Sequence, residues 1–115
     1  MLKLDTFTRV YVECALWSST DDDGEPLDAS YGPEDIALQT LGQMILDCEA
    51  FQAYLAPGES LAQAGHDFWL TRNGHGAGFW DGDYPKARGK ELTGLCRPFG
   101  SFDLYVGDDG KVHGM

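Results

Sequence analysis

The chain has 115 residues, a length typical of one domain, and its 19 acidic against 8 basic side chains give a formal net charge of −11. This acidity excludes binding to nucleic-acid phosphates or to an anionic membrane surface, because both interactions depend on Lys and Arg. No apolar run approaches the roughly 18 residues of a membrane-spanning helix, and no secretory signal pattern is present, so we expect a cytoplasmic single domain over residues 1–115.

The first half of the chain has the periodicity of helices. Residues 5 or 6 to 18 carry apolar side chains at three- and four-residue spacing, which favours a helix, although alternation at Thr8, Val10 and Val12 leaves a strand as the competing prediction. A polar loop over residues 18–32 follows, and Pro33 opens a second helix that ends before residues 57–58. Residues 59–64 form one short further turn. The apolar stripe expected on the second helix consists of Ile36, Leu41, Met44, Ile45, Cys48, Phe51 and Leu55.

The second half has the shorter period of strands. Residues 68–72 and 77–80 predict two aromatic strands joined by a hairpin across residues 73–76, because Asn-Gly is a strong hairpin signal. A loop over residues 81–88, a short helix over 90–96, and strands over 102–106 and 111–113 complete the chain. The expected fold class is therefore α+β, with two N-terminal helices packed on a small antiparallel sheet of three to four strands and one further short helix.

The charge is divided unevenly along the chain. The acidic helical half, residues 1–71, holds 13 acids and 2 bases, whereas the neutral hairpin-rich half, residues 72–115, holds 6 of each. Such asymmetry indicates an interaction surface, and the alternative is a solvated face that only keeps the protein soluble. An exposed Trp pair on the sheet would supply apolar anchors for the same interface. The candidate partner-binding residues are Asp21, Asp22, Asp23, Glu25, Asp28, Glu34, Asp35, Trp69 and Trp80.

Residues 65–81 concentrate the side chains capable of chemistry. An acid–base or metal site is one interpretation, but a hairpin would hold His66 and His75 roughly 13 Å apart, and no recognised metal-ligand spacing is present. The structural interpretation, in which glycines supply turns and Asp67 or His66 bridges the hairpin mouth, explains more of the pattern. We therefore expect no catalytic residue, no metal and no cofactor. The motif, of unknown role, consists of His66, Asp67, Arg72, Asn73, His75 and Asp81.

The cysteines and the basic residues have simpler interpretations. Three scattered cysteines never form a C-x-x-C pair, so we expect each to be a small buried hydrophobe. The basic cluster is expected to balance part of the acidic half, either within one subunit or between the subunits of a homo-oligomer. This cluster consists of Lys86, Arg88, Lys90 and Arg97.

The second half of the chain also carries a resemblance. The block AGHDFWLTRNGHGAGFWD at residues 64–81, followed by G-x-x-L-T at 89–93 and LYVGDDG at 104–110, resembles an uncharacterised family of short phage, prophage and plasmid proteins. The resemblance implies an accessory protein of a mobile element and supplies no catalytic residues. Small acidic proteins of such elements often inhibit host machinery, in some cases by imitating the charge of DNA.

These observations favour a small acidic phage or mobile-element protein that acts through protein–protein interaction rather than as an enzyme. Its carboxylates would occupy a basic surface on a host nucleic-acid-handling or defence complex, such as a CRISPR effector, restriction enzyme or polymerase. One alternative is a metal-binding protein or small enzyme that uses His66, Asp67, His75 and Asp81, with a second subunit bringing the histidines together. The other is a structural accessory protein with no inhibitory role.

Overall fold

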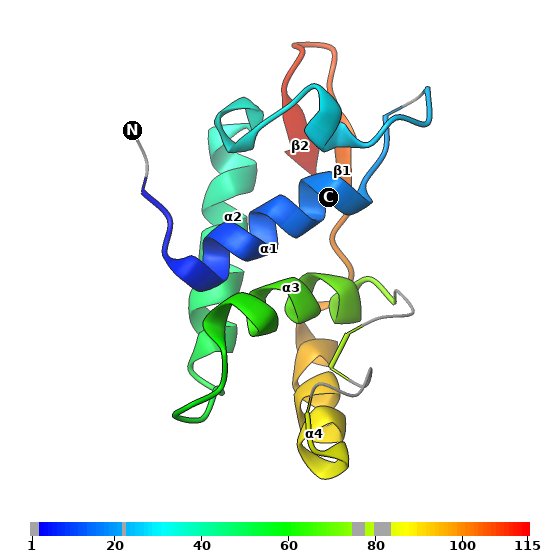
Figure 1. Cartoon of the computed structure of the whole chain (residues 1–115). Coiled ribbons are helices and arrows are strands. Elements are labelled where there is room, and N and C mark those ends of the chain that lie inside the picture. Colours follow the sequence, from blue (N-terminus) through cyan, green and yellow to red (C-terminus); the bar gives the residue numbers. More distant parts are fainter. Residues whose placement is uncertain (1–2, 22, 75–77, 80–83) are drawn as a thin grey trace.

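The computed structural model describes residues 3–21, 23–74, 78–79 and 84–115, and over these residues the fold is α+β (Figure 1). Its helices are α1 (Thr6–Ser18), α2 (Leu38–Gln52), α3 (Leu61–Arg72) and α4 (Lys86–Cys96), and its strands are β1 (Leu104–Val106) and β2 (Val112–Gly114). Short 3-10 turns lie at Leu27–Ala29, Pro33–Asp35 and Arg97–Phe99. The predicted fold class is confirmed, but the sheet has two described strands instead of three or four.

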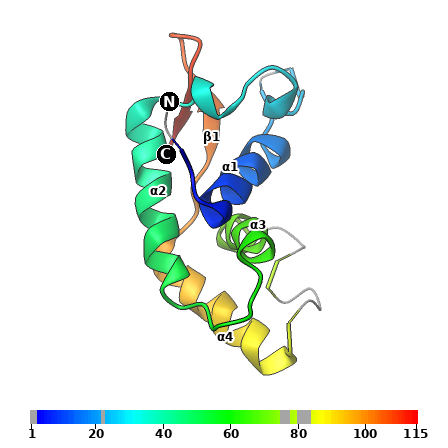
Figure 2. The same cartoon turned by 60° about the vertical axis from the view of Figure 1, so that its left-hand side comes forward.

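Helices α1 and α3 pack against each other at the centre of the molecule, and α2 lies along one side (Figure 2). Asp5 caps α1, because its carboxylate accepts the backbone N–H of Thr8 at 2.8 Å. Gly65 allows the two helices to approach closely, since a Cβ there would overlap the backbone carbonyl of Phe7. The aromatic cluster beneath these helices consists of Phe7, Tyr11, Phe51, Phe68, Phe79 and Phe99.

Residues 68–72 belong to α3, so the predicted strand over these residues, and the hairpin it would form, are wrong. Ser60 caps the helix by accepting the N–H of Gln63 at 3.1 Å, and the turn predicted over residues 59–64 is therefore the start of α3. The helix ends at Arg72, and Gly74 lies two residues later with a positive φ of 72°, which suits a helix terminus as well as a hairpin. Of the second predicted strand, Gly78 and Phe79 lie in a bend and a turn, and the other residues lie outside the described ones.

The helix predicted near the N-terminus is confirmed as α1, and the competing strand is wrong. Pro33 opens a 3-10 turn and not α2, because Ile36 is extended and forms a parallel bridge with Val112. Helix α2 then begins at Leu38 and ends at Gln52. Four residues of its predicted stripe are buried on α2: Leu41, Met44, Cys48 and Phe51.

The C-terminal hairpin is confirmed with small shifts of its bounds. Strands β1 and β2 pair antiparallel with Tyr105 opposite His113, and Gly110 at φ 78° makes the turn between them. Helix α4 begins at Lys86, four residues earlier than predicted, and ends at Cys96. Across the described part of the chain, none of the helices is sufficiently long and apolar to cross a membrane.

Candidate functional site

The acidic segment, residues 19–35, covers the end of the molecule that also carries the β1–β2 hairpin, opposite to α4 (Figures 1 and 2). Its side chain Leu27 is fully buried in the core. Thr20 and Pro26 form an antiparallel bridge, and the Asp21 backbone N–H donates to the carbonyl of Glu25 at 2.9 Å. The acidic segment is therefore held against the fold by one apolar anchor and by its own backbone hydrogen bonds.

Two carboxylates of the acidic segment accept hydrogen bonds from its backbone, and four other described acidic residues are exposed. Asp21 Oδ1 accepts the backbone N–H groups of Asp23 at 2.9 Å and Glu25 at 3.0 Å, and Asp35 Oδ2 accepts that of Gly32 at 2.8 Å. Among the residues that the structure describes, no Lys or Arg forms an ion pair with the acidic segment. Asp22 lies outside the described residues. The exposed carboxylates are those of Asp23, Glu25, Asp28 and Glu34.

Trp17 is the exposed aromatic side chain nearest in sequence to the acidic segment. It is 60% exposed at the last turn of α1, two residues before the acidic segment begins. Trp17 lies three residues after Cys14, so it belongs to the apolar spacing that predicts the first helix. Apolar spacing alone could not predict that Trp17, at the end of α1, is exposed.

Trp69, in contrast, is buried, so the exposure predicted for it is wrong. Its side chain is 2% exposed, and its indole N–H donates to Ser18 Oγ at 2.7 Å. The ring meets Tyr11 edge-on, with centroids 5.4 Å apart. Trp69 therefore fastens α3 to the end of α1. Trp80 lies outside the described residues.

His66 and Asp67 occupy adjacent positions on α3. His66 Nδ1 lies 3.3 Å from Asp67 Oδ1, and the carboxylate of Asp67 is buried and accepts from the Gln63 amide at 3.0 and 3.1 Å. Their predicted place at a hairpin mouth is wrong, because both are helical. His75 and Asp81 lie outside the described residues, and the described ones contain no group of three metal-ligating side chains.

Arg72 is a buried structural hub. Its guanidinium donates to Tyr11 Oη and Asp47 Oδ2, each at 2.9 Å, and to the carbonyls of Phe99 and Gly100, each at 2.8 Å. Burial raises the pKa of Tyr11, so this hydroxyl stays neutral beside the cation. Arg72 thus joins α1, α2 and α3 to the segment after α4, which sequence reasoning missed because all the partners are distant in the chain.

Asn73 and the three cysteines make structural contacts or lie in the core. Asn73 donates to the carbonyl of Trp69 at 3.0 Å and accepts the backbone N–H of Phe102 at 2.8 Å, which ties the end of α3 to the chain before β1. All three cysteines are free and buried, as predicted. Burial raises the pKa of Cys14 and of Cys96 to about 12, which keeps these thiols protonated at neutral pH.

The residues of the basic cluster fall into two groups. Arg88 pairs with Glu59 at 2.8 Å and with Glu91, and its guanidinium also donates to the carbonyl of Tyr54 at 2.8 Å. Arg88 thus neutralises acidic residues of its own subunit, which was one of the two predictions for the basic cluster. Lys86, Lys90 and Arg97 form no ion pair with the described residues and border a cavity.

Comparison with known proteins finds no match to this chain among protein-family models, curated proteins or solved structures.

Proposed function

We propose that this protein is a phage or mobile-element accessory protein that binds a basic surface on a host complex and thereby keeps nucleic acid from it. The contact surface is the acidic segment together with Trp17. The observation that carries the proposal is a structured acidic segment whose exposed carboxylates have no basic partner among the described residues.

The order of the acidic segment supports a binding role over simple solvation. Ordering a loop on association costs free energy, and a segment already held by Leu27 and the Thr20–Pro26 bridge avoids most of that cost. A face that serves only solubility needs no such anchoring. Asp21 and Asp35 satisfy backbone N–H groups, whereas the residues Asp23, Glu25, Asp28 and Glu34 are exposed.

The electrostatics favour a partner that normally holds DNA or RNA. Unpaired carboxylates at one end of an elongated molecule steer it toward positive surfaces and raise the association rate. Grooves that bind nucleic acid are lined with Lys and Arg, because they neutralise closely spaced phosphates. CRISPR effectors, restriction enzymes and polymerases are therefore the partner classes that this surface suits.

Trp17 supplies the apolar part of the interface. Tryptophan is enriched among the few side chains that dominate binding energy, and these usually lie among polar contacts that exclude water. At 60% exposure Trp17 retains apolar surface that a partner can cover. It takes the role that the sequence had given to Trp69.

The test is a DNA-competition assay on a purified representative of each partner class. The triple variant Asp23→Asn, Glu25→Gln and Asp28→Asn removes three exposed charges and retains the structural carboxylates of Asp21 and Asp35. We expect inhibition of DNA binding by the wild-type protein, loss of inhibition as salt rises, and at least a tenfold weaker effect of the variant.

A matched control removes the same charge elsewhere. Glu13→Gln, Glu49→Gln and Glu91→Gln neutralise three exposed carboxylates on α1, α2 and α4, and this variant should inhibit almost as well as the wild type. If both triple variants lost inhibition equally, the effect would depend on net charge alone, and this outcome would contradict the proposed surface. Absence of inhibition in all three partner classes would contradict the proposed function.

Trp17→Ala tests the apolar anchor separately. We expect about tenfold weaker inhibition with an unchanged salt dependence, because the substitution removes contact area and no charge. Leu46→Ala is the control, since Leu46 is also 60% exposed but lies on α2. A Trp17→Ala protein that inhibits like the Leu46→Ala protein would remove Trp17 from the interface.

A further inference from the structure

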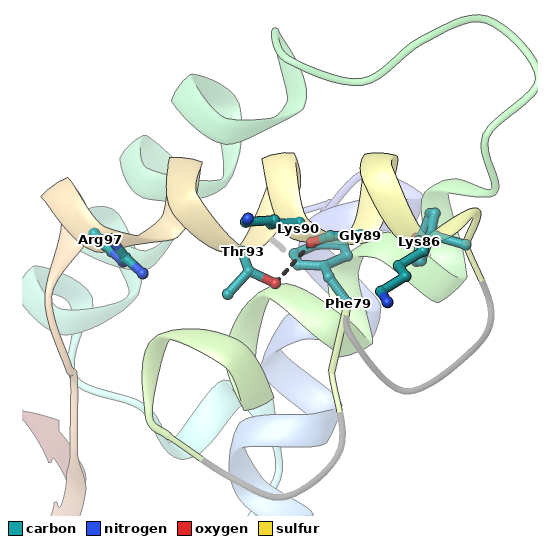
Figure 3. A pocket seen from close by; sticks show the side chains of 7 residues that line it. Phe79, Lys86, Gly89, Lys90, Thr93 and Arg97 are labelled. Atoms are coloured by element: carbon teal, nitrogen blue, oxygen red, sulfur yellow. Dashed lines mark hydrogen bonds between the residues drawn. The ribbon is translucent and has the colours of Figure 1, made fainter.

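The end of the molecule opposite to the acidic segment contains a cavity of about 560 Å³ beside α4 (Figure 3). Pockets for small ligands commonly have volumes of about 300–1,000 Å³, with a largely apolar lining and a few polar groups that fix orientation. This cavity has that composition. The residues that line it are Phe79, Tyr84, Lys86, Gly89, Lys90, Thr93 and Arg97.

Three cations border the cavity, two from α4 and one from the 3-10 turn that follows it. Lys86 and Lys90 are one turn apart on α4, and Arg97 is the first residue of the turn Arg97–Phe99 (Figure 3). None of them forms an ion pair within the described part of the chain. Arg88 lies between the two lysines and is fully engaged by Glu59 and Glu91. One side of α4 is therefore neutralised by the ion pairs of Arg88, and the side that faces the cavity retains the positive charge of the lysines.

The apolar part of the cavity is built into the core. Phe79 is 1% exposed, and its ring packs on Phe51 and Tyr84 with centroids 5.6 and 5.4 Å away. Its backbone N–H donates to Thr71 Oγ1 at 3.1 Å. A Cβ at Gly89 would lie 2.5 Å from the Phe79 carbonyl oxygen, so a glycine is what permits this close contact.

A second cavity, of about 240 Å³, adjoins the first along α4. Thr93 and Arg97 line both, and Arg72 and Cys96 line only the smaller one. Thr93 Oγ1 donates to the Gly89 carbonyl at 2.7 Å, which fixes the threonine side chain between the two cavities. Arg97 is therefore placed to reach a charged group at the junction, whereas Lys86 and Lys90 flank the larger space.

We propose that the cavity beside α4 binds a small organic phosphate, with an aromatic or apolar body against Tyr84, which covers Phe79, and the phosphate held by Lys90 and Arg97. Lysine and arginine are the side chains that proteins use for phosphate, and arginine adds bidentate hydrogen bonds. The site uses residues separate from the acidic segment and is independent of the function proposed above. A mononucleotide and a simple aryl phosphate share this chemistry.

The experiment is a titration of the full chain with phenyl phosphate, inorganic phosphate and phenol, followed by calorimetry and by backbone amide NMR of residues 86–97. We expect phenyl phosphate to bind at least tenfold more tightly than either fragment, because only it uses both the cations and the apolar surface. Equal affinity for phenyl phosphate and inorganic phosphate, or no binding at millimolar concentration, would overturn the proposal.

A variant pair assigns the binding to the cavity. Lys90→Ala with Arg97→Ala should weaken phenyl phosphate binding at least tenfold, whereas Lys3→Ala with Lys111→Ala removes the same charge from exposed positions elsewhere and should leave it unchanged. Circular dichroism establishes that both variants are folded. Similar losses in the two variants would show a general charge effect and would overturn the site.

Two further ligands distinguish the sources of the phosphate. Adenosine monophosphate tests a mononucleotide, and a single-stranded oligonucleotide with a 5′-phosphate tests a nucleic-acid end. We expect the mononucleotide to bind and the oligonucleotide to bind at least tenfold more weakly, because the net charge of −11 repels a polyanion. Tighter binding of the oligonucleotide would overturn the assignment to a small molecule.

Discussion

The two ends of this molecule differ in the sign of their exposed charges and in the shape of the surface that carries them. The acidic segment carries exposed carboxylates on its turns, whereas α4 and the turn after it place cations that pair with no described carboxylate around a cavity (Figures 1 and 3). A projecting charged surface suits a macromolecule, and a concave one suits a small ligand. The net charge of −11 therefore does not give the local charge at either end. The molecule is 43 Å long in its longest dimension, and the acidic segment and the cations beside the cavity lie at opposite ends of it.

The interior shows a third arrangement of charge, in which the cation is fully partnered. Arg72 contacts four oxygen acceptors, and its guanidinium lies 5.4–5.9 Å from the ring centroids of Phe68, Phe99 and Phe102. A buried charge without such partners would be strongly destabilising. The comparison thus predicts that charges at the ends serve binding and that the buried charge serves stability.

The largest expected effect follows from removing the buried cation. Arg72→Met should lower the free energy of unfolding by about 3–5 kcal/mol, because it leaves Asp47 without its partner and three carbonyl or hydroxyl oxygens without their donor. Chemical denaturation measures this loss. Arg97→Met, at the cavity, should cost less than about 1 kcal/mol. Similar losses in the two variants would contradict the division between structural and binding charges.

The next effect concerns two glycines on α4. Gly89→Ala should cost about 1–3 kcal/mol, because the new methyl group meets the Phe79 carbonyl and the backbone must shift. Gly94→Ala is the matched control, since nothing lies within 4 Å of a Cβ there, and it should stabilise the protein by about 0.5–1 kcal/mol. Thermal unfolding of both variants measures the difference, and the same sign for both would contradict the close contact at the cavity.

Periodicity predicted the elements whose packing is local, and failed where distant contacts decide. α1, the buried stripe of α2 and the C-terminal hairpin follow from spacing and turn residues. Residues 68–72 are rich in residues that favour strands, and Asn73-Gly74 suits a hairpin as well as a helix end. The close approach of Gly65 to Phe7 favours the helix, and this contact joins residues far apart in the sequence.

The candidate site was predictable in its charge and not in its anchor. A region without Lys or Arg between Arg9 and Arg72 is visible in the sequence, and it includes the acidic segment. Trp69, expected to be exposed, is buried and donates a hydrogen bond to Ser18, whereas Trp17 at the end of α1 is exposed. The cavity needs Phe79, Gly89 and Arg97 together, and their spacing carries no recognised motif.

A smaller effect is expected at acidic pH from the ion pair on the neutralised side of α4. The hydrogen bonds from Arg88 lower the pKa of Glu59 from an ordinary 4.5 to about 2. A carboxylate with a depressed pKa in the folded state stabilises the protein fully above its unfolded pKa, and this stabilisation is lost as the pH falls toward 2.

Glu59→Gln should therefore destabilise the protein by about 1 kcal/mol at neutral pH, and its difference from the wild type should shrink below pH 4.5. Urea denaturation between pH 7 and pH 2.5 measures the trend. Glu49→Gln removes an exposed carboxylate that pairs with no described cation and should follow the wild type at each pH. A constant difference between Glu59→Gln and the wild type would contradict the shifted pKa.

The smallest effect on stability is expected at the acidic segment, where the largest effect on binding is proposed. Asp23→Asn, Glu25→Gln and Asp28→Asn together should change the free energy of unfolding by no more than about 0.5 kcal/mol, because these exposed carboxylates pair with no cation in the described part of the chain. Any change should be a gain at low salt, since neutralisation relieves repulsion within the segment. Asp21→Asn, which weakens the acceptor of two backbone N–H groups, should destabilise the protein more than the triple variant does. Denaturation at low and high salt separates these contributions. A triple variant that loses stability in proportion to its binding would mean that the carboxylates hold the fold, and the contrast between the two ends would then rest on the cations alone.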